Sequence, residues 1–278
     1  MPDCIDLHLH TSFSDGALTP AELLVRVRQA SLAAFAVSDH DTVDGYRQMR
    51  ALLEPDDPEL VAGLELSVAV NASDLHMLAY LFDPEHEELG DTLRRFREAR
   101  NLRGDKIVRK LNEQGLSLRF EAVLEAANGS AIGRPHIAEA MVKQGLVGSI
   151  DDAFRKHIGD HCPAYIPKTM IRPEEAIALI HRAGGLTVLA HPFINDMHRL
   201  VPSLVKQGLD GLEVFHYSHN RQQVQELKRL AARHNLLRTG GSDFHGRQEH
   251  EGEIGAYQVP VEYLTTMKER ALKIRGRV

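Results

Sequence analysis

The chain has 278 residues, of which 16 are histidine and none is tryptophan. Lysine and arginine number 33 against 39 aspartate and glutamate, so the formal net charge is −6 and no overall positive field attracts nucleic acid. A composition of 43% apolar and 26% charged residues excludes a disordered or low-complexity chain. The two cysteines form no disulfide framework, and no apolar run reaches the length of a membrane-spanning helix, so we expect a cytoplasmic protein without membrane contact.

Short apolar runs alternate with helical patterns in the first third of the chain, as in the βα units of a mainly parallel sheet or barrel. Strands are expected at Cys4–His10, Ala33–Ser38, Leu60–Ala69 and Leu75–Phe82. A capping box at Thr19 opens a helix that ends near Ser31, and a second helix is expected around Val43–Leu53.

The middle of the chain lacks this alternation. From about Glu85 to Ile158 the pattern is helical, with turns expected at Gly104, Gly115 and Gly145. We therefore expect residues 99–166 to form a helical insert between a first barrel part, 1–98, and a second, 167–278. Its position between strands that share a rim suggests a lid over the substrate.

The alternation of strands and helices resumes after the insert. Helices are expected at Pro173–Ala183, Leu200–Gln207, Arg221–His234 and Val261–Lys273. Strands are expected at Leu186–Ala190, Gly211–Phe215, Leu236–Thr239 and Gly255–Pro260. The sequence thus predicts an α/β barrel that is interrupted once.

Histidine and carboxylate side chains recur near the ends of the expected strands. His8 and His10 lie two residues apart, so their rings share one face of a strand. The whole set is His8, His10, Asp15, His40, Glu65, His76, His191, Asp243 and His245. A single histidine at a strand end is usually a satisfied polar residue, but six such placements favour convergence on one rim, where α/β folds build their sites.

This set contains only nitrogen and oxygen ligands. Imidazole and carboxylate without thiolate point to Mn, Fe or Zn and away from a structural cysteine site. Nine ligands exceed the number that one ion accepts, so we expect two or three ions.

The order of these motifs resembles the PHP (polymerase and histidinol phosphatase) superfamily. The motifs are His8-Leu9-His10, Ser38-Asp39-His40-Asp41, Gly63-Leu64-Glu65, His76, Ala190-His191-Pro192 and Ser242-Asp243-Phe244-His245. The resemblance implies a distorted (β/α)7 barrel of PHP type and a trinuclear metal centre that hydrolyses phosphoesters, with Mn²⁺ expected and Fe or Zn as alternatives. It assigns His8, His10, Glu65 and Asp243 to the first ion, Glu65, His76 and His191 to the second, and Asp15, His40 and His245 to the third.

Three further segments narrow the resemblance to one branch of that superfamily. They are Ile132–Ala138, Ala164–Lys168 and Gly211–His219, and they are similar to stand-alone 3′,5′-nucleoside bisphosphate phosphatases and 5′-to-3′ exoribonucleases. The resemblance implies a phosphatase that removes the 3′-phosphate of a nucleotide such as adenosine 3′,5′-bisphosphate. The alternatives are an exonuclease on short 5′-phosphorylated RNA, a histidinol-phosphate phosphatase, and a non-catalytic metal- or nucleotide-binding module. The sequence sets no oligomeric state, and a monomer is compatible with it.

Hydrolysis would need a nucleophile and neutralisation of the phosphoryl oxygens, both of which clustered divalent ions supply. We expect a metal-bridging hydroxide to attack phosphorus in line. Arg134 and Lys168 are the candidate phosphate ligands, although most such cations lie free on a surface. His216 could protonate the leaving oxygen and His219 could contact a second phosphate, while packing roles suit both equally well. His136 is expected to be structural.

Eight basic residues lie between Arg94 and Lys110. This excess could attract a nucleotide or short RNA. However, cations spaced by three residues spread around a helix, and few aromatic residues lie among them to stack on bases. We therefore expect a solvated helix face here.

Overall fold

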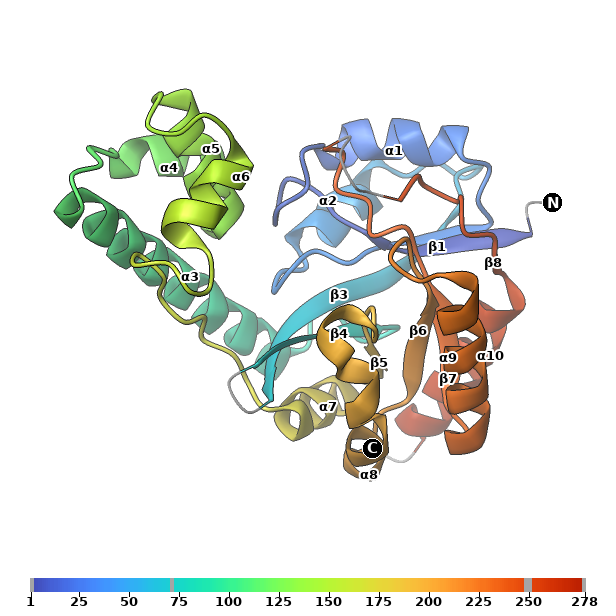
Figure 1. Cartoon of the computed structure of the whole chain (residues 1–278). Helices are drawn as coiled ribbons and strands as arrows, with labels where there is room; N and C mark the ends of the chain where they lie inside the picture. Colours follow the sequence, from blue (N-terminus) through green and yellow to red (C-terminus); the bar gives the residue numbers. More distant parts are fainter. Residues whose placement is uncertain (1–2, 71–72, 248–251, 277–278) are drawn as a thin grey trace.

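The computed structural model describes residues 3–70, 73–247 and 252–276, and it contains one sheet that curls into a nearly closed barrel (Figure 1). The strands follow the order β7-β6-β5-β4-β3-β2-β1-β8. Their bounds are β1 (Cys4–Leu9), β2 (Ala34–Val37), β3 (Glu59–Val70), β4 (Ser73–Tyr80), β5 (Leu186–Leu189), β6 (Gly211–Phe215), β7 (Leu237–Gly240) and β8 (Val259–Pro260). Leu9 pairs with Phe244, just beyond β7, and this contact brings the two sides of the barrel together. The expected α/β barrel is confirmed.

The direction of two strands differs from the mainly parallel sheet that the sequence suggested. β4 is antiparallel to both β3 and β5, and β8 is antiparallel to β1. Only two residues separate β3 from β4, and a link that short joins antiparallel strands, because a parallel crossover needs a dozen residues or more. The beginning of β4 therefore lies at the same rim as the ends of the parallel strands.

The last strand is shorter than expected. The sequence suggested a strand over Gly255–Pro260, and the structure forms one only at Val259–Pro260. Its two residues pair with Cys4 and Ile5 at the start of β1. The barrel proper thus consists of β1 to β7, with β8 as a short addition at its edge.

Helices cover the outside of the barrel within one or two residues of the expected bounds. They are α1 (Pro20–Gln29), α2 (Asp44–Leu52), α7 (Pro173–Arg182), α8 (Val201–Gln207), α9 (Arg221–His234) and α10 (Glu262–Arg275), with a short 3-10 helix at Ile194–Leu200. The capping box at the start of α1 is present, because Thr19 and Glu22 bond to each other's backbone N–H. α7 packs on β3 and β5, α9 on β6 and α10 on β7.

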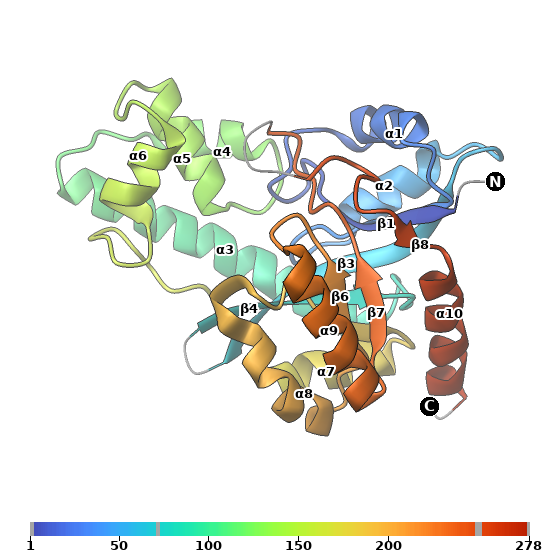
Figure 2. The ribbon, with the colours of Figure 1, turned by 45° about the vertical axis from the view of Figure 1, so that its right-hand side comes forward.

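The middle of the chain forms a separate group of helices beside the barrel (Figure 2). They are α3 (Glu87–Glu113), α4 (Phe120–Ala127), α5 (Arg134–Lys143), α6 (Ile150–Ala153) and a π-helix at Phe154–Ile158. A core of their own, which includes Ile107, Val123 and Met141, holds them together. The boundary expected after residue 98 falls inside α3, which runs from the barrel into this group without a break.

The turn expected at Gly104 is wrong. Gly104 is buried within α3, and a Cβ atom there would lie 2.6 Å from Cγ2 of Ile132. The glycine therefore permits close packing of α3 against the segment before α5. Among the described residues, no helix is long and apolar enough to cross a membrane.

Candidate metal centre

The nine predicted ligands all lie at one rim of the barrel. His8 is within β1 and His10 follows it, while Glu65 lies within β3. His40 follows β2, His191 follows β5, and Asp243 and His245 follow β7. Asp15 lies in the loop after β1, and His76 lies in the antiparallel strand β4. The convergence expected from the sequence is thus present in the structure.

The first group brings four side chains together. His8 Nε2 lies 3.2 Å from Asp243 Oδ1 and 3.3 Å from Glu65 Oε2. His10 Nε2 lies 3.0 Å from Asp243 Oδ1 and 3.4 Å from Glu65 Oε2. These four residues can offer one ligand atom each to a single ion.

Glu65 also faces a second group through its other oxygen. Oε1 lies 2.9 Å from His76 Nδ1 and 3.2 Å from His191 Nε2. On the Oε2 side, His40 Nδ1 lies 3.2 Å away. Because the two oxygens of Glu65 face different sets of histidines, this carboxylate can bridge two positions.

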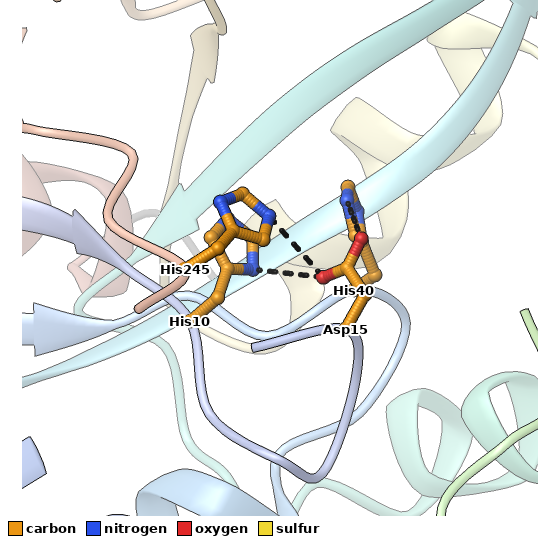
Figure 3. A group of neighbouring side chains, drawn as sticks. All are labelled: His10, Asp15, His40 and His245. Carbon is orange, nitrogen blue, oxygen red and sulfur yellow. Dashed lines mark ion pairs between the residues drawn. The ribbon is translucent and has the colours of Figure 1, made fainter. Parts of the chain in front are cut away.

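The third group surrounds Asp15 (Figure 3). Asp15 Oδ1 lies 3.3 Å from His245 Nε2 and 3.7 Å from His10 Nδ1, and Oδ2 lies 3.6 Å from His40 Nε2. His10 therefore belongs to this group as well as to the first, a role that the sequence did not suggest. His40 likewise faces both Asp15 and Glu65.

The spacing of these atoms fits divalent ions. Ligand atoms about 2.1 Å from one ion, at tetrahedral or octahedral angles, lie about 3.0 to 3.4 Å from one another. The distances in the first group span 3.0 to 3.4 Å. In addition, Nδ1 of His10 and Nδ1 of His40 are buried and have no hydrogen-bond partner among the described residues. Buried polar atoms normally have a hydrogen-bond partner, so atoms without one are suited to act as ligands of a cation.

The carboxylates of the rim create a strongly negative surrounding for the imidazoles. Burial opposes charge on His8 and on Glu65 alike, yet Asp243 and Glu213 raise the pKa of His8 well above its usual value. His40 and His76 hold the pKa of Glu65 well below its usual value. His245, although buried, has a pKa raised to about 10, chiefly by Asp15. A divalent cation would supply the same positive charge by displacing protons from these rings.

Two predicted ligands adopt rarely populated backbone conformations. His191 has φ 28° and Asp243 has φ 54°, both in the left-handed region that disfavours residues other than glycine. Such residues persist only where surrounding contacts hold them, and they cluster at functional sites. The strain therefore marks the same rim as the ligand geometry.

Two predicted catalytic or substrate residues lie behind the centre. His216 is buried, with Nε2 3.2 Å from Asp243 Oδ2 and Nδ1 2.8 Å from Ser218 Oγ. The Nδ1 atom of His219 lies 3.1 Å from the carbonyl oxygen of Val214, and burial lowers the pKa of this histidine to about 4. Neither residue is among those that line the cavity beside the centre. His136 accepts a hydrogen bond from the Gly133 N–H, as expected of a structural residue.

A cavity of about 670 Å³ opens beside the centre. Asp15, His40 and His76 line it on the side of the centre. Its other lining residues include four cations that come from the insert or follow it: Arg100, Arg103, Arg134 and Lys168. The two predicted phosphate ligands, Arg134 and Lys168, thus share one cavity with part of the metal centre.

The cations of the cavity differ in how they are neutralised. Lys168 Nζ lies 2.9 Å from Asp74 Oδ2, Arg134 Nη1 lies 2.5 Å from Asp160 Oδ1, and Arg100 pairs with Asp41. Arg103 is only 8% exposed and forms no ion pair with a described residue; its Nε donates to the carbonyl of Ile166. Burial, together with the charges of Arg134 and Arg100, lowers the pKa of Arg103 to about 10. An anion in the cavity would relieve this repulsion.

The expectation of a solvated face over Arg94–Lys110 is wrong for two residues. Arg103 is buried and the side chain of Arg100 is only 13% exposed. By contrast, Arg94 and Arg109 are more than 70% exposed. The rotation of α3 against the barrel decides which cations face the cavity, and a spacing of three residues does not reveal it.

Glu213 is a site residue that was not predicted from the sequence. It lies in β6, fully buried, among His8, His191 and His216. A carboxylate in the middle of an otherwise apolar strand was the available signal, because charged residues are almost never fully buried without partners.

Comparison with known proteins gives concordant results. A family model described as "PHP domain" matches residues 6–128. The chain is 32% identical over 247 residues to the 5′-3′ exoribonuclease Rnm of Salmonella typhimurium, covering 86% of this chain and 84% of that protein. It is also 32% identical over 257 residues to the 3′,5′-nucleoside bisphosphate phosphatase of Chromobacterium violaceum, covering 90% of each. A solved structure from Bifidobacterium adolescentis, provisionally described as a metal-dependent phosphoesterase, has a TM-score of 0.87 and 33% identity over 96% of both chains.

Proposed function

The chain belongs to the PHP domain family and is a metal-dependent phosphoesterase, and from that premise we propose that it removes the 3′-phosphate of 3′,5′-bisphosphate nucleotides such as adenosine 3′,5′-bisphosphate. One observation carries the proposal: a single cavity joins residues of the metal centre to a group of cations. A substrate with two phosphates matches this arrangement, because one phosphate can meet the centre while the other meets the cations. The cavity volume lies within the usual range for small-molecule sites.

The proposed centre holds three divalent ions, with Mn²⁺ as the expected metal. His8, His10, Glu65 and Asp243 would hold the first, Glu65, His76 and His191 the second, and Asp15, His40 and His245 the third. Bound divalent ions supply a nucleophile from water at neutral pH and neutralise the phosphoryl oxygens. The protein orients these ligands by burying them and by fixing the backbone of His191 and Asp243.

Arg103, Arg134 and Lys168 are proposed to bind the second phosphate. Arginine grips phosphate through two parallel hydrogen bonds, and lysine acts as a point charge. Arg103 is the strongest of the three candidates, since it forms no ion pair with a carboxylate among the described residues. Arg134 and Lys168 would exchange Asp160 and Asp74 for the phosphate.

Exonuclease action on short 5′-phosphorylated RNA is a second candidate function, and one feature favours it. A smaller cavity of about 220 Å³ shares Ala131 with the first, and its lining includes Arg47, Arg94 and Arg97. A chain longer than one nucleotide could extend from the first cavity into this second one, where the three arginines stand beside Asp41 and Asp44. The relative named as an exoribonuclease is consistent with that possibility.

Phosphate release from a panel of substrates tests the proposal. The panel contains adenosine 3′,5′-bisphosphate, AMP, histidinol phosphate and a 5′-phosphorylated short RNA, with the chain first stripped by chelator and then supplied with Mn²⁺. We expect Mn²⁺-dependent release chiefly from the bisphosphate. Preferred release of nucleotides from the RNA would establish the second candidate instead, preferred hydrolysis of histidinol phosphate would overturn both, and metal-independent turnover would refute the centre.

A further inference from the structure

Glu213 uses both of its oxygens to contact residues that carry proposed ligands. Oε1 lies 2.9 Å from Nδ1 of His8, and Oε2 accepts a hydrogen bond of 2.7 Å from the backbone N–H of His191. The carboxylate is fully buried in β6, between β5 and β7. One side chain thus connects the first proposed ion position with the second.

The contact with His8 determines which nitrogen of that ring is free. An ionised carboxylate can only accept hydrogen bonds, so Nδ1 of His8 must carry the proton. The lone pair is then on Nε2, which faces Asp243 Oδ1 at 3.2 Å and Glu65 Oε2 at 3.3 Å. The same arrangement, in which a carboxylate holds the far nitrogen of a ligating histidine, orients ligands in metal sites generally.

The contact with His191 supports a strained backbone. His191 has φ 28°, which residues other than glycine rarely adopt. The hydrogen bond from the His191 N–H to Glu213 anchors His191 in that conformation. Nε2 of His191 then lies 3.2 Å from Glu65 Oε1. Without the acceptor, this partly buried N–H would lose its hydrogen bond, and the ring would lose its fixed approach to Glu65.

We propose that Glu213 is a positioning residue of the metal centre, which fixes the tautomer of His8 and the backbone of His191 and binds no ion itself. The inference rests on the proposed metal centre. The alternative is that Glu213 is a ligand, because Glu213, His8 and His216 can offer atoms within 4.8 Å of one another. Both oxygens of Glu213 already face N–H groups, however, so the geometry favours positioning.

The residue just before β6 provides a matched control. Asp210 lies immediately before β6 and is also a buried carboxylate; its Oδ2 is 2.7 Å from Nε2 of His181 and accepts the Thr187 backbone N–H at 2.9 Å. Asp210 therefore has the same two kinds of partner as Glu213, but neither of them belongs to the proposed centre. E213Q and D210N remove one charge each and preserve side-chain size.

The test measures Mn²⁺ binding to the chelator-stripped full chain by calorimetry and counts bound ions at saturation by elemental analysis. We expect E213Q to weaken Mn²⁺ binding by about 10- to 100-fold while the number of ions bound at saturation stays that of the wild type. We expect D210N to change the thermal midpoint but to leave the Mn²⁺ affinity within about twofold of wild type, since its partners do not touch the ligands.

Three results would overturn the proposal. An E213Q affinity equal to that of the wild type would remove the positioning role, and saturation of E213Q with fewer ions would make Glu213 a ligand. A wild-type chain that binds no Mn²⁺ would overturn the proposed metal centre and this inference with it, so the two failures are distinguishable. If E213Q does not fold, E213D serves as the second variant: it keeps the charge, but its shorter side chain cannot span both contacts, and the same loss of affinity is expected.

Discussion

Glu65 is the carboxylate around which the histidines of the rim gather. Its oxygens lie within 3.4 Å of ring nitrogens of His8, His10, His40, His76 and His191. The removal of any one of these rings takes a polar partner away from a buried carboxylate, which is costly in a low-dielectric interior. Substitutions at the rim should therefore affect the whole centre and not one ion alone.

His10 gives a direct test of this view, because its two nitrogens face the first and the third groups. We expect H10A to lower turnover more than 100-fold, since even the loss of an outer-shell partner costs about 10- to 100-fold. Mn²⁺-dependent phosphate release measures the effect. The control is H234A, at the end of α9, which should turn over normally. Near-normal rates in H10A would refute the three-ion arrangement.

Arg103 determines substrate preference if the second phosphate binds in the cavity. R103M keeps the volume of the side chain and removes its charge. We expect kcat/KM for adenosine 3′,5′-bisphosphate to fall about 10- to 100-fold, the effect of losing one charged hydrogen bond, mainly through a higher KM. Hydrolysis of adenosine 3′-monophosphate, which lacks the second phosphate, should change little.

The control for Arg103 lies on the same helix. R109M removes an exposed guanidinium that pairs with Asp105 at 2.9 Å, and it should leave both substrates unaffected. Equal losses on the bisphosphate and the monophosphate in R103M would indicate a general packing defect and contradict a phosphate-binding role.

At the scale of the elements, the sequence predicted strands and outer helices well because their apolar periodicity is local. The bounds of β6 and α9 agree fully with expectation. The antiparallel direction of β4 was missed because apolar periodicity carries no information on strand direction. The short link between β3 and β4 did carry that information. The side chains of Arg100 and Arg103 could not be placed from the sequence, because the direction in which they point depends on the rotation of α3 against the barrel. The contacts of Glu213 could not be predicted either, because they depend on strands that are far apart in the sequence.

Gly104 in α3 illustrates how packing overrides propensity. Alanine normally stabilises a helix relative to glycine by about 0.5–1 kcal/mol. At Gly104, however, the new methyl group would lie 2.6 Å from Cγ2 of Ile132, and overpacking typically costs about 1–3 kcal/mol. We expect G104A to lower the free energy of unfolding, as measured by urea denaturation.

Gly90 in the same helix is the matched control for Gly104. Its added methyl group would meet only Nη1 of Arg94, at 3.7 Å, so G90A should be neutral or stabilising. If G104A proved as stable as G90A, the close approach of α3 to Ile132 would be refuted.

At the scale of the whole molecule, one ion pair ties the insert to the rim. Arg100 of α3 contacts Asp41, which follows His40, and also lies 3.2 Å from Ser67 Oγ in β3. Asp41 in turn accepts hydrogen bonds from Ser67. The position of α3 over the cavity is thus coupled to the loop that carries a proposed ligand.

The pH dependence of stability should reveal this tie. Burial opposes ionisation of Asp41, but Arg100 and Lys168 lower its pKa from 3.8 to about 2. The pKa of Asp41 is lower in the folded chain than in the unfolded chain, so its ionised form stabilises the fold. This contribution to the free energy of unfolding is about 2 kcal/mol; it is complete above about pH 4 and is lost as the pH falls towards 2. In chelator, urea unfolding should show D41N destabilised at pH 7 and less so at pH 3. A deficit independent of pH would contradict this account.

The closure of the barrel between Leu9 and Phe244 has a consequence for the order of assembly. Residues from opposite ends of the described chain, His8 and Asp243, belong to the same ligand group. A chain emerging from the ribosome cannot complete that group until nearly all of it has been made, so we expect tight metal capture to be a late event that reports the finished fold. Truncation before Asp243 should abolish tight Mn²⁺ binding even where the preceding strands have formed, and equilibrium dialysis of such a fragment would measure it.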